Sequence, residues 1–170
     1  STYVTEMISM TDQMRESTLL FNQIIEGNNH QLANDPTKPT QVPLAKAEVA
    51  FIDFSSIQNA LFQLDQSANS LSEGLSKGTM AKSALEGINQ ALYRAEQSLL
   101  TEQGLPRRPW YKHTLYAPGF YTGYGVKTMP GIREAIEQRD WKEAQQRINI
   151  AAHAIGKLAE HLKAASMRAK

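Results

Sequence analysis

The histidines and carboxylates of this chain are its best candidates for metal binding or acid–base chemistry, but their spacing supports neither. The histidines are His30, His113, His153 and His161, and the last two are eight residues apart. Two ligands on adjacent turns of a helix require a spacing of four residues. The sequence also lacks an HExxH motif, a Glu-Glu pair and any cysteine. We therefore expect no catalytic residue, no metal site and no cofactor in this chain.

Glycine and lysine near residue 125 give a second, superficial candidate for chemistry. Val126 separates Gly125 from Lys127, which breaks the GxxxxGK[ST] spacing of a phosphate-binding loop, and no strand is expected before it. The sequence has no GxSxG motif either, so a serine nucleophile would have no characteristic turn to occupy. These patterns favour a binding or structural role over catalysis.

Charge and hydropathy exclude two further classes of partner. The formal net charge is +1, whereas a nucleic-acid-binding domain is usually strongly basic. No apolar run approaches the roughly 18 residues that a membrane-spanning helix needs. We expect neither nucleic acid nor membrane as a partner.

The charge is unevenly distributed along the chain. Residues 1–100 carry 6 basic and 11 acidic residues, whereas residues 101–170 carry 12 basic and 6 acidic residues. The halves either attract each other, or the basic half docks on an acidic neighbour.

The elements that must position these residues are helices. Apolar side chains recur at alternating steps of three and four residues, which is the spacing of one helix face. Asp140 and Glu143 have the spacing of a capping box at the start of the last helix. The predicted class is all-α, with four long helices in a bundle and one short helix, in a single domain covering residues 1–170. The predicted helices span about residues 3–27, 44–75, 79–102, 131–138 and 140–168.

One segment, residues 103–130, does not fit a plain bundle. It contains four of the seven prolines, four of the ten glycines and six of the thirteen aromatic residues. Aromatic residues argue against disorder, and prolines lower the entropy cost of ordering a loop. A long loop inside a domain is usually functional or disordered. We expect an ordered loop that presents tyrosines and basic groups to a partner. The alternative is a loop that only seals one end of the bundle with its aromatic rings.

Four blocks of this loop resemble the C-terminal domain of the glutamate carboxypeptidase II and transferrin receptor family. They occur in the family's order and at nearly its spacings: GLP at 104–106, RPWYKH at 108–113, YAP at 116–118 and MPGI at 129–132. The resemblance implies a helical dimerisation domain that forms a homodimer and follows a protease-like domain in a longer chain. This loop would complete the substrate pocket of that protease-like domain.

The resemblance also implies where catalysis would occur. In peptidase members of the family, two zinc ions and the catalytic glutamate belong to the protease-like domain, so this chain alone is expected to be inactive. The parent protein would be a zinc-dependent exopeptidase, although receptor members of the family lack the metals. A peptide substrate is expected only in the full-length protein. The family further implies an extracytoplasmic location, either periplasmic or secreted.

A substrate-binding site is implied at the loop tip. In glutamate-selective members, a Lys-Tyr pair between the YAP and PGI blocks holds the carboxylates of a C-terminal glutamate. These positions align with Gly123 and Tyr124. The tyrosine hydroxyl can still donate to a carboxylate, but the charge-assisted bond is lost. Lys127 could replace it if the loop path differs. The parent is therefore predicted not to be strongly glutamate-selective.

A different class of function also remains open. The chain could be a free-standing helical bundle that binds a small ligand or peptide through the aromatic loop.

Overall fold

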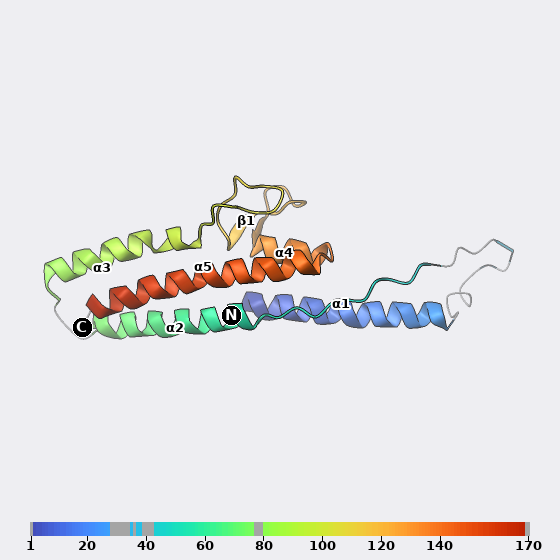
Figure 1. Cartoon of the computed structure of the whole chain (residues 1–170), viewed down its shortest axis with the longest axis horizontal. Coiled ribbons are helices and arrows are strands. Elements are labelled where there is room, and N and C mark those ends of the chain that lie inside the picture. Colours follow the sequence, from blue (N-terminus) through green and yellow to red (C-terminus); the bar gives the residue numbers. More distant parts are fainter. Residues whose placement is uncertain (1, 28–34, 36, 39–42, 77–79, 169–170) are drawn as a thin grey trace. The chain divides into compact units, whose positions relative to one another are not determined.

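The computed structural model describes residues 2–27, 35, 37–38, 43–76 and 80–168 (Figure 1). These residues form two compact units, one running from Val4 to Phe51 and the other from Ile52 to Lys170. A single domain over residues 1–170 remains a prediction of the sequence.

The N-terminal unit consists of helix α1 (Thr2–Glu26) and an extended segment at residues 43–51. The side-chain amide of Asn22 accepts a hydrogen bond from the backbone N–H of Lys46 and donates one to its carbonyl, both at 2.9 Å. The ammonium group of Lys46 lies 4.4 Å from the ring centroid of Phe21. These contacts hold the extended segment beside the last turns of α1.

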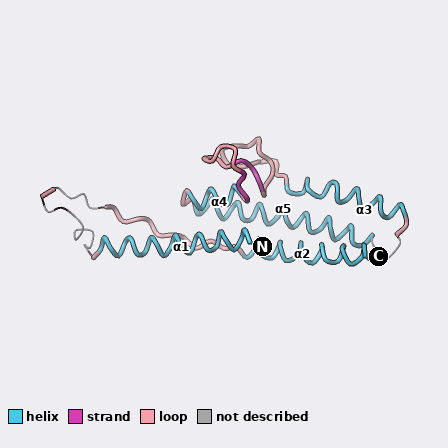
Figure 2. Tube along the Cα trace, turned by 180° about the vertical axis from the view of Figure 1, so that it is seen from behind, coloured by secondary structure: helices cyan, strands magenta, loops and turns pink. Residues whose placement is uncertain are grey.

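The C-terminal unit is built around its longest helix, α5 (Trp141–Arg168). Helices α2 (Ser55–Ser76), α3 (Lys82–Ala95) and α4 (Pro130–Glu137) and the 3-10 helix η2 (Glu96–Leu99) all pack on α5 (Figures 1 and 2). Leu71, Ile88 and Ala165 form a core cluster that joins α2, α3 and α5. Most buried positions of α5 are alanines, whose small side chains allow close approach of the surrounding helices.

The start of α5 confirms one half of the predicted capping box. The Asp140 carboxylate accepts a hydrogen bond from the backbone N–H of Glu143 at 2.9 Å, which satisfies a free donor of the first turn. The reciprocal bond is absent in this part of the structure, because the Asp140 N–H donates to the carbonyl of Ala135. The Glu143 carboxylate binds Arg107 of the loop.

The prediction of a helix from residue 44 is wrong over its first eleven residues, because α2 begins at Ser55. Residues 43–54 are extended, and Ile52 and Phe54 are buried on either side of the exposed Asp53. The side-chain amide of Gln145 bonds to both the N–H and the carbonyl of Asp53 at 2.9 Å. The Asp53 carboxylate then accepts from the N–H of Ser55 at 2.8 Å and marks the start of α2.

The remaining helices agree more closely with the sequence prediction. Helices α1, α4 and α5 begin and end within one residue of the predicted bounds. The predicted helix at 79–102 is shorter in the structure, where α3 and η2 together span Lys82–Leu99, so the prediction is wrong at residues 80–81 and 100–102. Residue 79 and His30 lie outside the described residues. Two strands were not predicted: β1 (Tyr116–Pro118) and β2 (Val126–Thr128) pair antiparallel, with Ala117 opposite Lys127. Three residues are too few to show an alternating pattern.

Within the described ranges, none of the helices combines the length and the apolar character needed to cross a lipid bilayer.

Candidate functional site

The base of the 103–130 loop is a compact, hydrogen-bonded structure. Its two legs pair through backbone bonds from Thr101 to Lys112 and from Thr114 to Leu99, both at 2.9 Å. Gly104 allows the tight turn between them, because its φ is +65° and a Cβ there would lie 2.3 Å from the carbonyl oxygen of Pro109. The GLP block therefore contains a glycine for a steric reason.

A buried ion pair fixes the loop to α4. The Nη2 atom of Arg108 lies 2.6 Å from Oε2 of Glu134, and the two side chains are only 7% and 2% exposed. The second guanidinium nitrogen, Nη1, donates to the carbonyl of Pro118. The other carboxylate oxygen accepts from the backbone N–H of Phe120 at 2.8 Å. Four polar groups from three segments thus bond to one another, while the Nε atom of Arg108 is buried without a hydrogen-bond partner among the described residues.

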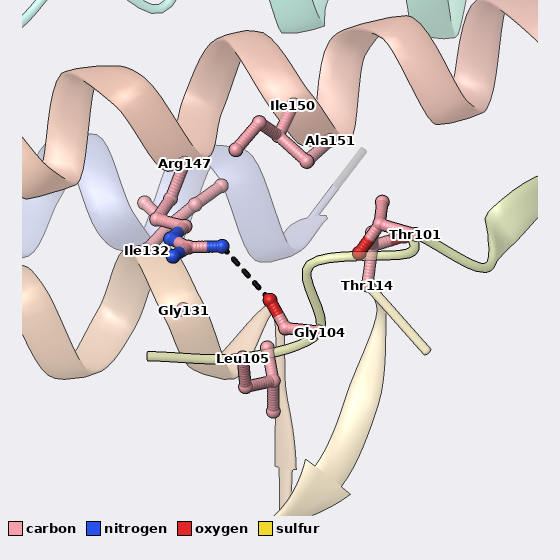
Figure 3. Close-up of a pocket in the computed structure, with 9 residues that line it drawn as sticks. All are labelled: Thr101, Gly104, Leu105, Thr114, Gly131, Ile132, Arg147, Ile150 and Ala151. Carbon is pink, nitrogen blue, oxygen red and sulfur yellow. Dashed lines mark hydrogen bonds between the residues drawn. The ribbon is translucent and has the colours of Figure 1, made fainter. Parts of the chain in front are cut away.

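Two further arginines join the loop to α5. Arg107 makes two hydrogen bonds to the Glu143 carboxylate, at 3.0 and 3.3 Å. Arg147 donates to the carbonyl of Gly104 at 3.0 Å (Figure 3). Burial lowers the pKa of Arg147, and the charge of Glu143 partly offsets this effect. Beside Arg147 is a small cavity of about 10 Å³, also lined by Thr101 and Thr114, which is near the lower limit for holding one water molecule.

His113 supports the strand that follows it. Its Nδ1 atom accepts hydrogen bonds from the backbone N–H groups of Leu115 and Tyr116, both at 3.2 Å, so the neutral ring carries its proton on Nε2. The ring stacks on Tyr116 with the centroids 4.5 Å apart. Burial lowers the pKa of His113, and Glu96, at 3.8 Å from Nε2, partly opposes this shift. These contacts give His113 a structural role.

The tip of the loop, residues 119–125, contrasts with its buried base. A turn closes it, with hydrogen bonds from the N–H of Gly125 to the carbonyl of Thr122 and from the N–H of Gly119 to the carbonyl of Gly125. Gly123 has a φ of +62°, and a Cβ at this position would meet no atom within 4 Å beyond its chain neighbours. The Tyr124 side chain is fully exposed, and Tyr121 is mostly exposed. The tip therefore presents phenol groups to solvent on a fixed base.

The structure separates the three predicted substrate-binding residues. Gly123 and Tyr124 lie together in the turn at the tip. Lys127 lies on β2, and its ammonium group is 2.6 Å from Oε2 of Glu137 on α4. Its side chain is only 15% exposed. Lys127 therefore points toward α4 in this structure, and its charge is paired.

Glu134 was not predicted as a site residue, and the helical spacing gave no signal for it. Glu134 is two residues from both Ile132 and Ile136, so it lies on the opposite side of α4 from this apolar pair. It is buried because Arg108 and Phe120 of the loop cover that side of the helix. The basic residues of the loop also pair with carboxylates of α4 and α5, which lie in the same basic half of the chain.

The described residues do not fit a zinc site. No group of three or more histidines, cysteines or carboxylates within this part of the chain could hold a metal ion. His153 and His161 are both exposed on α5.

Comparison with known proteins identifies the family. The sequence profile of the transferrin receptor-like dimerisation domain matches residues 52–163. A probable glutamate carboxypeptidase of Arabidopsis thaliana is 32% identical over 117 residues, covering 61% of this chain and 16% of that protein. A probable glutamate carboxypeptidase of Arthroderma benhamiae is 30% identical over 115 residues, covering 66% and 16%. An inactive zinc metalloprotease of Schizosaccharomyces pombe is 38% identical over 71 residues, covering 42% and 9%.

The chain thus spans about 16% of the length of the two carboxypeptidase relatives. The match to the family profile includes all of α2, α3 and α4, the whole aromatic loop and most of α5. This confirms the resemblance seen in the loop sequence, and the chain belongs to the transferrin receptor-like dimerisation domain family.

Proposed function

We propose that this chain is the homodimerisation domain of a glutamate carboxypeptidase-like zinc peptidase, and that its 103–130 loop completes the substrate pocket of a separate protease-like domain. The role of the loop in the substrate pocket is supported by the contrast between its fixed base and its exposed tip. Its base is fixed by the buried Arg108–Glu134 pair, while Tyr124 at the tip is fully exposed. A side chain held at a defined place with a free hydroxyl suits recognition of a partner or substrate.

Self-association is supported by the family and by apolar surface on α1 and α3. Leu19 and Leu20 are more than half exposed on α1, and Leu85 and Leu92 remain at least 40% exposed on α3. A dimer would bury such surface in a symmetric interface of about 2,000 Å² or more. Sedimentation of the full-length protein should give twice the monomer mass. A monomer at micromolar concentration would contradict the proposal.

The chemistry of the parent is assigned to residues outside this chain. Two zinc ions in the protease-like domain would activate water for peptide hydrolysis. This chain would contribute the Tyr124 hydroxyl, which can donate to the C-terminal carboxylate of a bound peptide. The names of two relatives support a peptidase, whereas the name of a third describes an inactive zinc metalloprotease. An extracytoplasmic location is proposed with the peptidase, from the same family.

The proposed specificity is weak preference for a C-terminal glutamate. Gly123 offers no charge at the tip, and the ammonium group of Lys127 is already bound to Glu137. The phenol of Tyr124 alone would supply a neutral hydrogen-bond donor, which binds a carboxylate less strongly than a charged ammonium group does.

Tyr124→Phe in the full-length protein tests the pocket. Losing one hydrogen bond to a carboxylate should raise KM about tenfold with little change in kcat. Tyr93→Phe is the matched control, because Tyr93 is equally a well-exposed tyrosine but lies on α3, outside the loop. Equal kinetics of the two variants would remove Tyr124 from the substrate site.

A further inference from the structure

Glu134 is a carboxylate placed where a helix would otherwise bury an apolar residue. Its neighbours on α4, Ile132, Ala135 and Ile136, are at most 2% exposed, and Glu134 itself is 1% exposed. Removing a carboxylate from water is costly unless charged or polar partners replace the water. A buried ion pair seldom adds much net stability compared with apolar residues of the same size. The burial of Glu134 is therefore better explained by the groups that its carboxylate oxygens bind than by a gain in stability.

The two carboxylate oxygens hold two different parts of the loop. Oε2 binds Nη2 of Arg108, from the first leg, and Oε1 accepts from the N–H of Phe120, where the tip begins. Arg108 also donates through Nη1 to the carbonyl of Pro118. The guanidinium of Arg108 thus binds Pro118, and the carboxylate of Glu134 binds Phe120, on the two sides of Gly119. The guanidinium carbon lies 5.4 Å from the ring centroid of Phe120, which adds a cation–π contact.

The other end of the tip is held independently. Val126 pairs with Pro118 in the two-stranded sheet, and Lys127 binds Glu137. Both ends of residues 119–125 are therefore tied to α4 or to β1, while Tyr121 and Tyr124 between them are mostly or fully exposed. The position of Tyr124 relative to α4 depends on these attachments rather than on packing of its own side chain, which is fully exposed.

We propose that Arg108 and Glu134 are positioning residues, whose joint function is to place the Tyr124-bearing tip relative to α4 and α5. The substrate-related part of this inference rests on the proposed function, since only that function says what the tip contacts. The geometric part does not depend on it. Arg108 suits the task better than a lysine would, because its planar group donates in two directions at once.

Amide hydrogen exchange on the full-length protein tests the geometric part. The double variant Arg108→Met with Glu134→Leu replaces the pair by apolar side chains of similar size, which are expected to leave the melting temperature nearly unchanged. Exchange in peptides covering residues 119–125 should rise about tenfold, while exchange in α5 stays the same. Unchanged exchange at the tip, or an equal rise throughout α5, would overturn the positioning role.

Two other variants sharpen this test. Arg108→Lys keeps the charge opposite Glu134 but cannot hold Pro118 at the same time, so the tip should again exchange faster. Glu143→Leu is the control, because it removes the neighbouring ion pair from the α5 side and leaves in place the contact of the Arg107 guanidinium with the ring of Phe120 in the tip. Faster exchange at the tip in this control would assign the effect to general loosening and overturn the proposal.

Kinetics on the same variants separate the positioning role from the proposed function. If the tip contacts substrate, the apolar double variant should raise KM about tenfold and change kcat little. Faster exchange at the tip with unaltered KM would support the positioning role and contradict the proposed substrate contact. Unaltered exchange would contradict the positioning role whatever the kinetics show.

Discussion

The Nζ atom of Lys127 lies 2.6 Å from Oε2 of Glu137, so the lysine nearest in sequence to Tyr124 is already paired with a carboxylate. Lys127 is the residue that could replace the missing lysine of the glutamate-selective family members. Its side chain is mostly buried, and its ammonium group faces α4. An ammonium group already paired with a carboxylate has less to gain from binding a second one.

Glu137→Gln should release Lys127 and make the proposed parent peptidase prefer acidic substrates. The ratio of kcat/KM for acidic over neutral dipeptides should rise about tenfold, because a charge-assisted hydrogen bond becomes available. Glu102→Gln is the control, since it removes one exposed negative charge just before the loop without touching Lys127. A ratio that rises equally in both variants would indicate a general electrostatic effect and not a specific role for Lys127.

Gly104→Ala should destabilise the domain by about 2 kcal/mol or more, since the residue has a positive φ and its new methyl group would overlap the backbone of Pro109. Gly156→Ala should instead stabilise the domain. No atom lies within 4 Å of a Cβ at that position in α5, so alanine should stabilise the helix by about 0.5–1 kcal/mol. Thermal denaturation of both variants measures the difference. A lower melting temperature for Gly156→Ala than for Gly104→Ala would contradict the loop geometry.

The helices of the C-terminal half could be predicted because their information is local. The stripe through Ile148, Ala151 and Ile155 repeats at helical spacing, and Asp140 marks the start of α5 by capping it. The extended path of residues 43–54 could not be predicted in this way. Leu44, Ala47 and Phe51 fit a helical stripe but are exposed.

The partners that stabilise this extended path are remote in sequence. Asn22 is 24 residues from Lys46, and Gln145 is 92 residues from Asp53. Each side-chain amide supplies a donor and an acceptor to an extended backbone, which replaces the hydrogen bonds of a helix. The loop follows the same rule. Its composition predicted order and exposed tyrosines, whereas the pairing of Arg108 with Glu134 depends on a fold that brings positions 26 residues apart together.

Gln145→Glu should loosen the residues before α2. The substitution keeps the acceptor for the N–H of Asp53 but replaces the donor to its carbonyl with a negatively charged oxygen, at a cost of about 1 kcal/mol or more. Amide exchange at residues 52–56 should accelerate. Gln146→Glu is the control at the adjacent position. Gln146 is exposed, and this substitution adds the same negative charge on another face of α5. Equal exchange in both variants would show that the amide of Gln145 does not hold this segment.

The loop should lose stability in mild acid, because the Nδ1 atom of His113 accepts two backbone hydrogen bonds. Burial lowers the pKa of His113 from the ordinary value of 6.5, so the unfolded chain binds the proton more readily than the folded one. The stabilising contribution is therefore complete above pH 6.5 and declines as the pH falls below 6.5 toward the folded-state pKa. A proton on Nδ1 would also abolish the bonds from Leu115 and Tyr116.

His113→Asn should reduce this dependence on pH, because the side-chain oxygen of asparagine can accept in place of Nδ1 but does not titrate. Melting temperatures measured from about pH 8 to about pH 5 should fall more steeply for the unmodified protein than for this variant. His161→Asn serves as the control, since His161 is exposed on α5, and it should retain the steep fall. If His113→Asn and the unmodified protein lose the same amount over this range, protonation of His113 does not govern the acid sensitivity of the loop.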